Sequence, residues 1–257
     1  MTPPPPSWLL QSGRFFFRVR NALFPILLLV MLVFTRPAMF LGNPVLDSLA
    51  IALGILLAAG GQTFRILVIG YAYIRRGGQN REVFANELVI RGFYAHSRNP
   101  MYVGNLCVVA GYSLVYGSAW AYGLLLPFFA YVYLAVTTAE ETYLRGKFGA
   151  AYDDYARRVN RFIPNPRGLR KSLAEFQYDW RRVLVKEYGT FCFTLVALLN
   201  LAAWKTAWVY GFAAFQKTIL ALCAASIPVG ILYIAIRFLK KTNRLRPLRL
   251  EETEQTL

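Results

Sequence analysis

Residues 92–104 read GFYAHSRNPMYVG, a polar segment punctuated by glycine and proline between two apolar runs. The segment contains His96, the only histidine of the protein. A second polar stretch, residues 140–164, begins with two adjacent glutamates and ends at a proline. The apolar run between the two stretches has a glycine and a serine at its middle, which favour a turn there. This pattern predicts a helical hairpin that brings the two polar stretches side by side.

The composition indicates an integral membrane protein. Hydrophobic residues make up 56% of the 257 residues, charged residues make up only 16%, and the mean hydropathy is +0.39. Soluble domains carry about 25% charged residues, and several apolar runs here approach the roughly 20 residues that cross a bilayer. No cleavable signal peptide is evident, because prolines 3–6 come before the first apolar run and no small-residue cleavage motif precedes it.

The apolar runs predict an all-α polytopic membrane protein of about six transmembrane helices, with the polar stretches between them as a cytosolic cap. The expected spans are residues 22–41, 45–73, 101–116, 119–139, 188–210 and 212–238. Pro25 is expected in the first turn of its helix, where a missing N–H costs little. A further surface helix is expected over residues 167–187, with one apolar side.

The spans divide the chain into four parts. They are an N-terminal interfacial segment (1–21), two transmembrane helices (22–74), a core made of a cytosolic loop, a transmembrane hairpin and a cytosolic helix (75–166), and an amphipathic helix with two further spans and a basic tail (167–257).

The distribution of positive charge predicts the orientation in the membrane. Of the 29 Lys and Arg residues, 25 fall in the N-terminal segment, residues 75–100, residues 140–187 and the tail. Cytoplasmic loops carry such an excess, so both termini and both polar stretches are expected in the cytosol. The net charge of +16 then fits anionic lipid headgroups, and we expect no nucleic-acid partner. Arg65, inside the second span, is expected to snorkel to the interface, with a cofactor or substrate contact as the alternative.

Two observations bear on chemistry before any family is considered. Glu140 and Glu141 end the fourth predicted span, where a carboxylate is costly unless it meets a cation or water. They are either a solvated helix end or part of a site, and Arg98 and Tyr94 across the hairpin favour the site. The cysteines lie in apolar runs without metal-like spacing, so no metal site or disulfide is expected.

The two polar stretches resemble the integral-membrane methyltransferases, namely the isoprenylcysteine carboxyl methyltransferase family and the related phospholipid N-methyltransferases. The positions that carry the resemblance are 92–94, 98–104, 140–141, 148–149, Tyr152, Tyr155 and 161–164. It covers about residues 81–164 and leaves the last two predicted spans unexplained.

The resemblance implies S-adenosylmethionine on the cytosolic side of the hairpin and a lipidic substrate that enters from the bilayer. The cofactor-binding residues that it implies by position are Tyr94, Arg98, Asn99, Pro100, Tyr102, Gly104, Glu140, Glu141, Tyr152, Tyr155 and Arg161. One of the two glutamates would pair with the cofactor's ammonium group. Arg98, Glu140, Glu141 and Arg145 are the candidate catalytic residues.

Asn99 stands where the family often has histidine. Asparagine donates and accepts hydrogen bonds but does not titrate, so at this position the resemblance implies cofactor binding and not an acid–base role. His96 is offset from that position by three residues. It is either a polar loop residue or a further cofactor contact, and we keep it among the candidate cofactor-binding residues.

The chemistry of the acceptor stays open. Methyl transfer from a sulfonium has an excellent leaving group, so alignment is the protein's main task and can contribute roughly 7–11 kcal/mol. A carboxylate or phosphate acceptor needs a positive cradle, which Arg145 or Arg161 could supply. An amine needs a base, which Glu140 or Glu141 could supply. The scarcity of histidine favours an anionic acceptor.

Two other functions are compatible with parts of the sequence. An integral-membrane, NADPH-dependent sterol-type reductase has a similar cytosolic Arg-x-Pro-x-Tyr segment but usually more spans before it. A channel or transporter would need a regular polar stripe along a span, and none is present in the sequence. The sequence does not indicate an oligomeric state.

Overall fold

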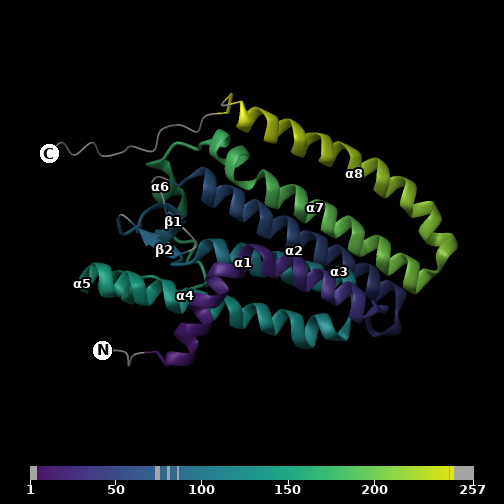
Figure 1. Ribbon diagram of the computed structural model, residues 1–257, viewed down its shortest axis with the longest axis horizontal. Helices are drawn as coiled ribbons and strands as arrows, with labels where there is room; N and C mark the ends of the chain where they lie inside the picture. The colour runs from purple at the N-terminus through teal and green to yellow at the C-terminus, as the bar shows by residue number, and fades with distance from the viewer. Residues whose placement is uncertain (1–4, 73–75, 80–81, 86, 243, 246–257) are drawn as a thin grey trace.

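The protein is an elongated bundle of long helices with a smaller cap at one end (Figure 1). The structure, a computed structural model, describes residues 5–72, 76–79, 82–85, 87–242 and 244–245. Its elements are α1 (Ser7–Phe34), η1 (Phe40–Gly42), α2 (Pro44–Gly70), β1 (Arg76–Gln79), β2 (Glu82–Ala85), η2 (Gly92–Ala95), α3 (Pro100–Tyr116), η3 (Ala121–Leu125), α4 (Leu126–Phe148), α5 (Ala150–Arg158), α6 (Leu169–Ala174), α7 (Trp180–Tyr210) and α8 (Phe212–Lys241).

Four helices are long and apolar enough to cross a membrane, namely α2, the continuous η3–α4 helix, α7 and α8. The two bent halves of α1 would make a fifth span. These helices make the chain an integral membrane protein, but the six predicted spans are not all confirmed. The helix α3 occupies the third predicted position with only 17 residues, fewer than the roughly 20 that a typical span needs.

The helix α1 starts earlier than predicted and bends sharply. Its halves, Ser7–Arg20 and Ala22–Phe34, meet at 84°. Pro25 lies inside the helix, not in its first turn as we expected. A proline ring clashes with the carbonyl four residues before it, which here is residue 21, where the two halves meet. The first half therefore lies nearly perpendicular to the second, as an interfacial segment next to a span would.

The helices α2 and α3 pack closely because glycines face each other at two levels. A Cβ on Gly61 would lie 2.5 Å from the carbonyl oxygen of Gly104, and a Cβ on Gly111 would lie 2.4 Å from that of Gly54. Without these side chains the two backbones can approach directly. This contact fixes the start of α3, and with it the first polar stretch, against α2.

The cap, defined as β1, β2, η2, α5 and α6 with their connections, contains a feature that an all-α prediction missed. β1 and β2 form an antiparallel hairpin with Arg76 opposite Ala85. Gly149, with φ of +52°, separates α4 from α5. Positive φ is strained for other residues.

The surface helix predicted over residues 167–187 is wrong as a single element. The structure has the short α6 and then a new helix, α7, which starts at Trp180 and runs without a break to Tyr210. Asp179 caps α7, since its carboxylate accepts from the backbone N–H of Arg182 at 3.0 Å. The fifth span thus begins eight residues earlier than expected.

The described ends of the chain lie on the same side as the cap (Figure 1). The connections between α1 and α2, between α3 and α4, and between α7 and α8 lie at the opposite end of the bundle. This is the arrangement that the predicted topology requires, and the assignment of the cap side to the cytosol stays a prediction. Some basic residues that support it lie outside the described residues, namely Arg75, Arg81, Arg246 and Arg249.

Candidate functional site

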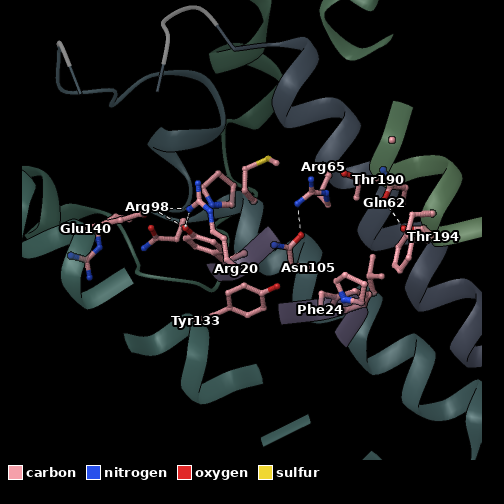
Figure 2. Close-up of a pocket in the computed structure, with 18 of the residues that line it drawn as sticks. Arg20, Phe24, Gln62, Arg65, Arg98, Asn105, Tyr133, Glu140, Thr190 and Thr194 are labelled. Atoms are coloured by element: carbon pink, nitrogen blue, oxygen red, sulfur yellow. Dashed lines mark hydrogen bonds and ion pairs between the residues drawn. The ribbon is translucent and has the colours of Figure 1, made fainter. Parts of the chain in front are cut away.

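A pocket of about 580 Å³ lies beside the cap, among α1, α2, α3, α4 and α7 (Figure 2). Residues from both polar stretches line it. The predicted site residues among its walls are Tyr94, Arg98, Asn99, Pro100, Tyr102 and Glu140. The structure therefore brings six of the twelve predicted cofactor-binding residues to one cavity.

Glu140 is the carboxylate on this wall of the pocket. Its Oε1 accepts a hydrogen bond from the hydroxyl of Tyr102 at 2.8 Å and lies 3.6 Å from the guanidinium of Arg20. Arg20 also donates to the Tyr102 hydroxyl at 2.9 Å. These contacts hold the carboxylate in one orientation and balance its charge.

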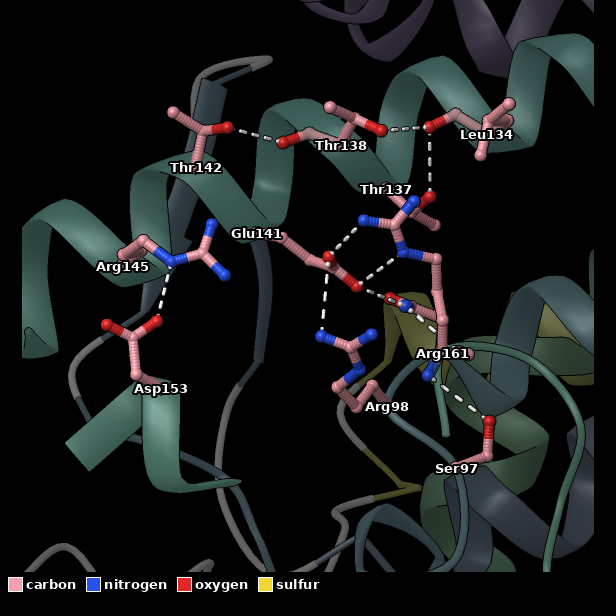
Figure 3. A network of polar contacts seen from close by, with 11 residues as sticks. Ser97, Arg98, Leu134, Thr137, Thr138, Glu141, Thr142, Arg145, Asp153 and Arg161 are labelled. Carbon is pink, nitrogen blue, oxygen red and sulfur yellow. Dashed lines mark hydrogen bonds and ion pairs between the residues drawn. The ribbon is translucent and has the colours of Figure 1, made fainter. Parts of the chain in front are cut away.

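Glu141 points instead into the cap, between two arginines (Figure 3). Its Oε2 lies 2.6 Å from Arg161 and 3.4 Å from Arg98, and Asn99 donates to its Oε1 at 3.3 Å. Glu141 is only 3% exposed. Successive residues on a helix project about 100° apart, so the neighbouring glutamates of α4 point in different directions, Glu140 toward the pocket and Glu141 into the cap.

The first polar stretch is tied to the end of the second one by backbone contacts. The amide of Arg98 donates to the carbonyl of Asn160 at 2.9 Å, and the amide of Asn165 donates to the carbonyl of His96 at 3.0 Å. Ser97 donates to the carbonyl of Phe162 at 3.0 Å. The segment after α5 thus runs beside the segment before α3 and fixes where Arg98 enters the pocket.

His96 has both ring nitrogens occupied within the cap. Nδ1 lies 2.6 Å from the carbonyl oxygen of Asn165, and Nε2 lies 3.0 Å from the hydroxyl of Ser172. A carbonyl only accepts, so Nδ1 carries the proton and Nε2 accepts from the serine in the neutral ring. His96 does not line the pocket. Its hydrogen bond with Ser172 links the end of η2 to α6.

Three further predicted residues lie in the cap or, for Arg145, on α4 beside it, away from the pocket walls. Tyr152 and Tyr155 belong to its apolar core, and the Tyr155 hydroxyl donates to the carbonyl of Tyr94 at 2.7 Å. Arg145 pairs with Asp153 at 2.7 Å, and both side chains are more than one-third exposed. These residues support the cap that positions Tyr94 and Arg98.

Gly104 lies in the contact between α2 and α3 and not on the pocket wall. A Cβ there would meet the side chain of Arg65 at 2.6 Å and the carbonyl oxygen of Gly61 at 2.8 Å. Its position therefore gives it a packing role that also sets where Arg65 lies.

Sequence reasoning missed Gln62 and Asn105 in the pocket wall and gave a cofactor or substrate contact of Arg65 only as the alternative. Arg65 does not snorkel to the interface. Its guanidinium forms a bidentate ion pair with Glu187, at 2.7 and 2.9 Å. Arg65 lines the pocket together with Gln62 and Asn105. An arginine within an apolar run is itself a signal of a site. No spacing in the sequence linked it to Glu187, which is 122 residues away.

Comparison with known proteins supports the resemblance found in the sequence. Residues 49–151 match the phospholipid methyltransferase family, which confirms the similarity to integral-membrane methyltransferases over that part of the chain. The nickel-cobalt-cadmium resistance protein NccN of Alcaligenes xylosoxydans xylosoxydans is 36% identical over 80 residues, which cover 31% of this chain and 37% of that relative. The similarity thus spans little more than a third of the relative's length. No solved structure is significantly similar.

Proposed function

We propose that the protein is a membrane methyltransferase that uses S-adenosylmethionine to methylate a lipid or lipidated acceptor at the cytosolic face. The observation that carries this proposal is the pocket whose walls combine Arg98 and Tyr102 from one polar stretch with Glu140 from the other. These residues lie within the segment that matches a methyltransferase family.

The residues of the pocket fit the charges of the cofactor. Glu140 would accept from the ammonium of its amino-acid part, and Arg20 and Arg98, which line the same pocket, would pair with its carboxylate. The volume of about 580 Å³ falls within the range of about 300–1,000 Å³ typical of ligand pockets. When bound, S-adenosylmethionine supplies a methyl group on a sulfonium, and the task of these side chains is to hold and align it.

The two glutamates have separate roles in this proposal. Glu140 contacts the cofactor, because it reaches the pocket. Glu141 is a positioning residue, because its carboxylate holds Arg98 and Arg161 together inside the cap. Arg145, paired with Asp153, supports the cap and does not touch the reacting groups.

The acceptor reaches the pocket from the bilayer. The walls come from α1, α2, α3, α4 and α7, which include three of the candidate spans and both halves of the bent fifth. A carboxylate, a phosphate or an amine attached to an apolar chain would each fit this access. Neither comparison above points to a nicotinamide-dependent reductase.

Binding of labelled S-adenosylmethionine to the full chain in lipid nanodiscs tests the proposal. Glu140→Gln removes one charge-assisted contact and is expected to weaken binding about tenfold, and Arg98→Ala is expected to abolish it. Asp154→Asn is the matched control, because Asp154 is an exposed cap carboxylate, 55% exposed, that pairs only with Arg157 among the described residues. No binding by the unaltered protein, or equal affinity in all three variants, would refute the proposal.

A further inference from the structure

The pocket has a second polar end, away from Glu140 (Figure 2). We call it the inner polar group and define it as Gln62, Arg65, Asn105, Thr190 and Thr194, all of which line the pocket. Gln62 and Arg65 are on α2, Asn105 is on α3, and the two threonines are on α7. The helix α7 starts at Trp180, beyond the segment that matches the methyltransferase family. One wall of the pocket is therefore supplied from outside that segment.

Arg65 is held rigidly in this wall. Its Nε and Nη2 donate to the two carboxylate oxygens of Glu187, and its Nη1 donates to Asn105. These contacts use three of its five N–H groups within the part of the chain that the structure describes. Gln62 gives Glu187 a further hydrogen bond at 3.0 Å. Glu187, which is 2% exposed, thus stands behind Arg65 and fixes the plane of its guanidinium.

The ion pair between Arg65 and Glu187 joins α2 to α7, but stabilising that contact does not explain why the pair is present. A buried pair is generally no better for stability than apolar packing of the same size. Another buried pair, Asp47 with Lys205 at 2.6 Å, already joins the two helices at the opposite end. The two pairs differ in one respect. Arg65 lines the pocket, whereas neither Asp47 nor Lys205 does.

The charge at this end of the pocket favours an anionic ligand. Of the three lining arginines, Arg20 and Arg98 serve the amino-acid part of the cofactor in the proposed function, which leaves Arg65 for the acceptor. Burying an ammonium beside Arg65 would be unfavourable, whereas an oxyanion would accept hydrogen bonds from its guanidinium. Phe24 and Phe193, whose ring centroids lie 5.9 Å apart, also line the pocket and suit an apolar chain.

We propose that Arg65, positioned by Glu187, binds the oxyanion head group of the methyl acceptor, a carboxylate or phosphate attached to an apolar chain. Because Glu187, Thr190 and Thr194 are on α7, this helix completes the end of the pocket that would hold the acceptor. The inference rests on the proposed function, because it assigns the acceptor of that same site. Arg65 contacts the acceptor, and Glu187 acts through Arg65.

Photo-crosslinking tests this assignment. Three diazirine probes with the same alkyl chain, ending in a carboxylate, a phosphate or a primary amine, are added at trace concentration to the full chain in nanodiscs. Labelled peptides are located by mass spectrometry. The test variant is Arg65→Gln with Glu187→Gln, which removes both charges and keeps amides that can hydrogen-bond. The matched control is Asp47→Asn with Lys205→Met, which removes the other buried pair that links α2 to α7.

The carboxylate or the phosphate probe is expected to label the pocket-facing part of α7 about tenfold more than the amine probe, and the test variant is expected to lose that preference. The control is expected to label like the unaltered protein, and Arg65→Lys, which keeps the charge, should retain the preference. Whichever oxyanion labels more strongly identifies the head group. Equal or stronger labelling by the amine, or unchanged labelling in the test variant, would overturn the assignment.

Binding of S-adenosylmethionine to the same variants separates this inference from the proposed function. The Arg65 and Glu187 variant is expected to bind the cofactor as the unaltered protein does. A parallel tenfold loss would make Arg65 a cofactor residue and overturn the assignment. If the unaltered protein binds no cofactor, the proposed function fails, while the labelling still decides whether an oxyanion binds at Arg65.

Discussion

Glu140 and Glu141 are neighbours in the sequence with different surroundings. Glu140 accepts a hydrogen bond from Tyr102 and pairs with Arg20 at the pocket wall. Glu141 lies buried between Arg98 and Arg161. Removing a buried carboxylate leaves its cationic partners uncompensated, which costs more than the pair itself contributes. The two residues should therefore respond differently to the same substitution.

Glu141→Gln is expected to lower the free energy of unfolding by roughly 2–4 kcal/mol, the range for a broken buried pair reduced for the partial exposure of Arg161. Thermal unfolding in detergent measures the change, with Glu140→Gln as the comparison. Glu140→Gln should lose less stability and more cofactor affinity. The roles assigned here would be reversed if Glu141→Gln were as stable as the unaltered protein but bound the cofactor poorly.

Asp47 and Lys205 form the most deeply buried ion pair of the described chain, with side chains 0% and 1% exposed. Lys205→Met alone leaves the carboxylate of Asp47 buried without its cation and is expected to cost roughly 3–5 kcal/mol. Asp47→Asn combined with Lys205→Met should cost clearly less, because no charge is left. A double-mutant cycle on thermal unfolding measures this coupling. Additive losses would show that the pair is not coupled.

At the scale of elements, the contact between α2 and α3 sets the geometry of the pocket. The glycines that permit it, Gly54 and Gly61 on α2 and Gly104 and Gly111 on α3, leave no room for a Cβ. Arg65 lies one turn after Gly61 and packs against Gly104. A wider separation of the two helices would therefore move Arg65 as well.

Gly61→Ala is expected to destabilise the protein by roughly 1–3 kcal/mol, because the new methyl group meets backbone that must shift. Gly60→Ala is the matched control from the same helix, since a Cβ there meets nothing within 4 Å. It should be neutral or stabilising by up to about 1 kcal/mol, as alanine favours helix over glycine. Thermal unfolding of both variants in one detergent gives the comparison, and equal effects would contradict the close packing of α2 against α3.

At the scale of the whole molecule, the cap and both described ends of the chain share one side of the bundle (Figure 1). The excess of Lys and Arg on that side predicts that it faces the cytosol. A cytosolic cap would place the proposed cofactor pocket where S-adenosylmethionine is available, with the apolar helices in the bilayer.

Cysteine labelling tests this orientation. With the three natural cysteines replaced by serine, Arg157→Cys in α5 and Arg36→Cys at the opposite end each present one exposed thiol. A membrane-impermeant maleimide should label Arg157→Cys only in inside-out vesicles and Arg36→Cys only in right-side-out ones. The reverse pattern would place the cap outside the cytosol and remove the cytosolic part of the proposed function.

The sequence by itself determined the long helices, the membrane setting and the meeting of the two polar stretches. These features follow from local signals, such as apolar runs of a certain length, glycine and proline, and a short turn that forces a hairpin. The resemblance to the methyltransferase families assigned Tyr94, Arg98, Tyr102 and Glu140 to one site, and all four line the pocket.

Only the tertiary structure decided which glutamate reaches the pocket, that His96 and Gly104 lie elsewhere, and that Arg65 meets Glu187. The bend of α1 that brings Arg20 to Glu140, and the continuous helix that carries Glu187, also escaped the sequence. The physical reason is that these outcomes depend on the packing of helices far apart in the chain. Periodicity fixes which face of a helix a residue occupies, but the neighbour on that face is set by close contacts such as those of Gly61 with Gly104.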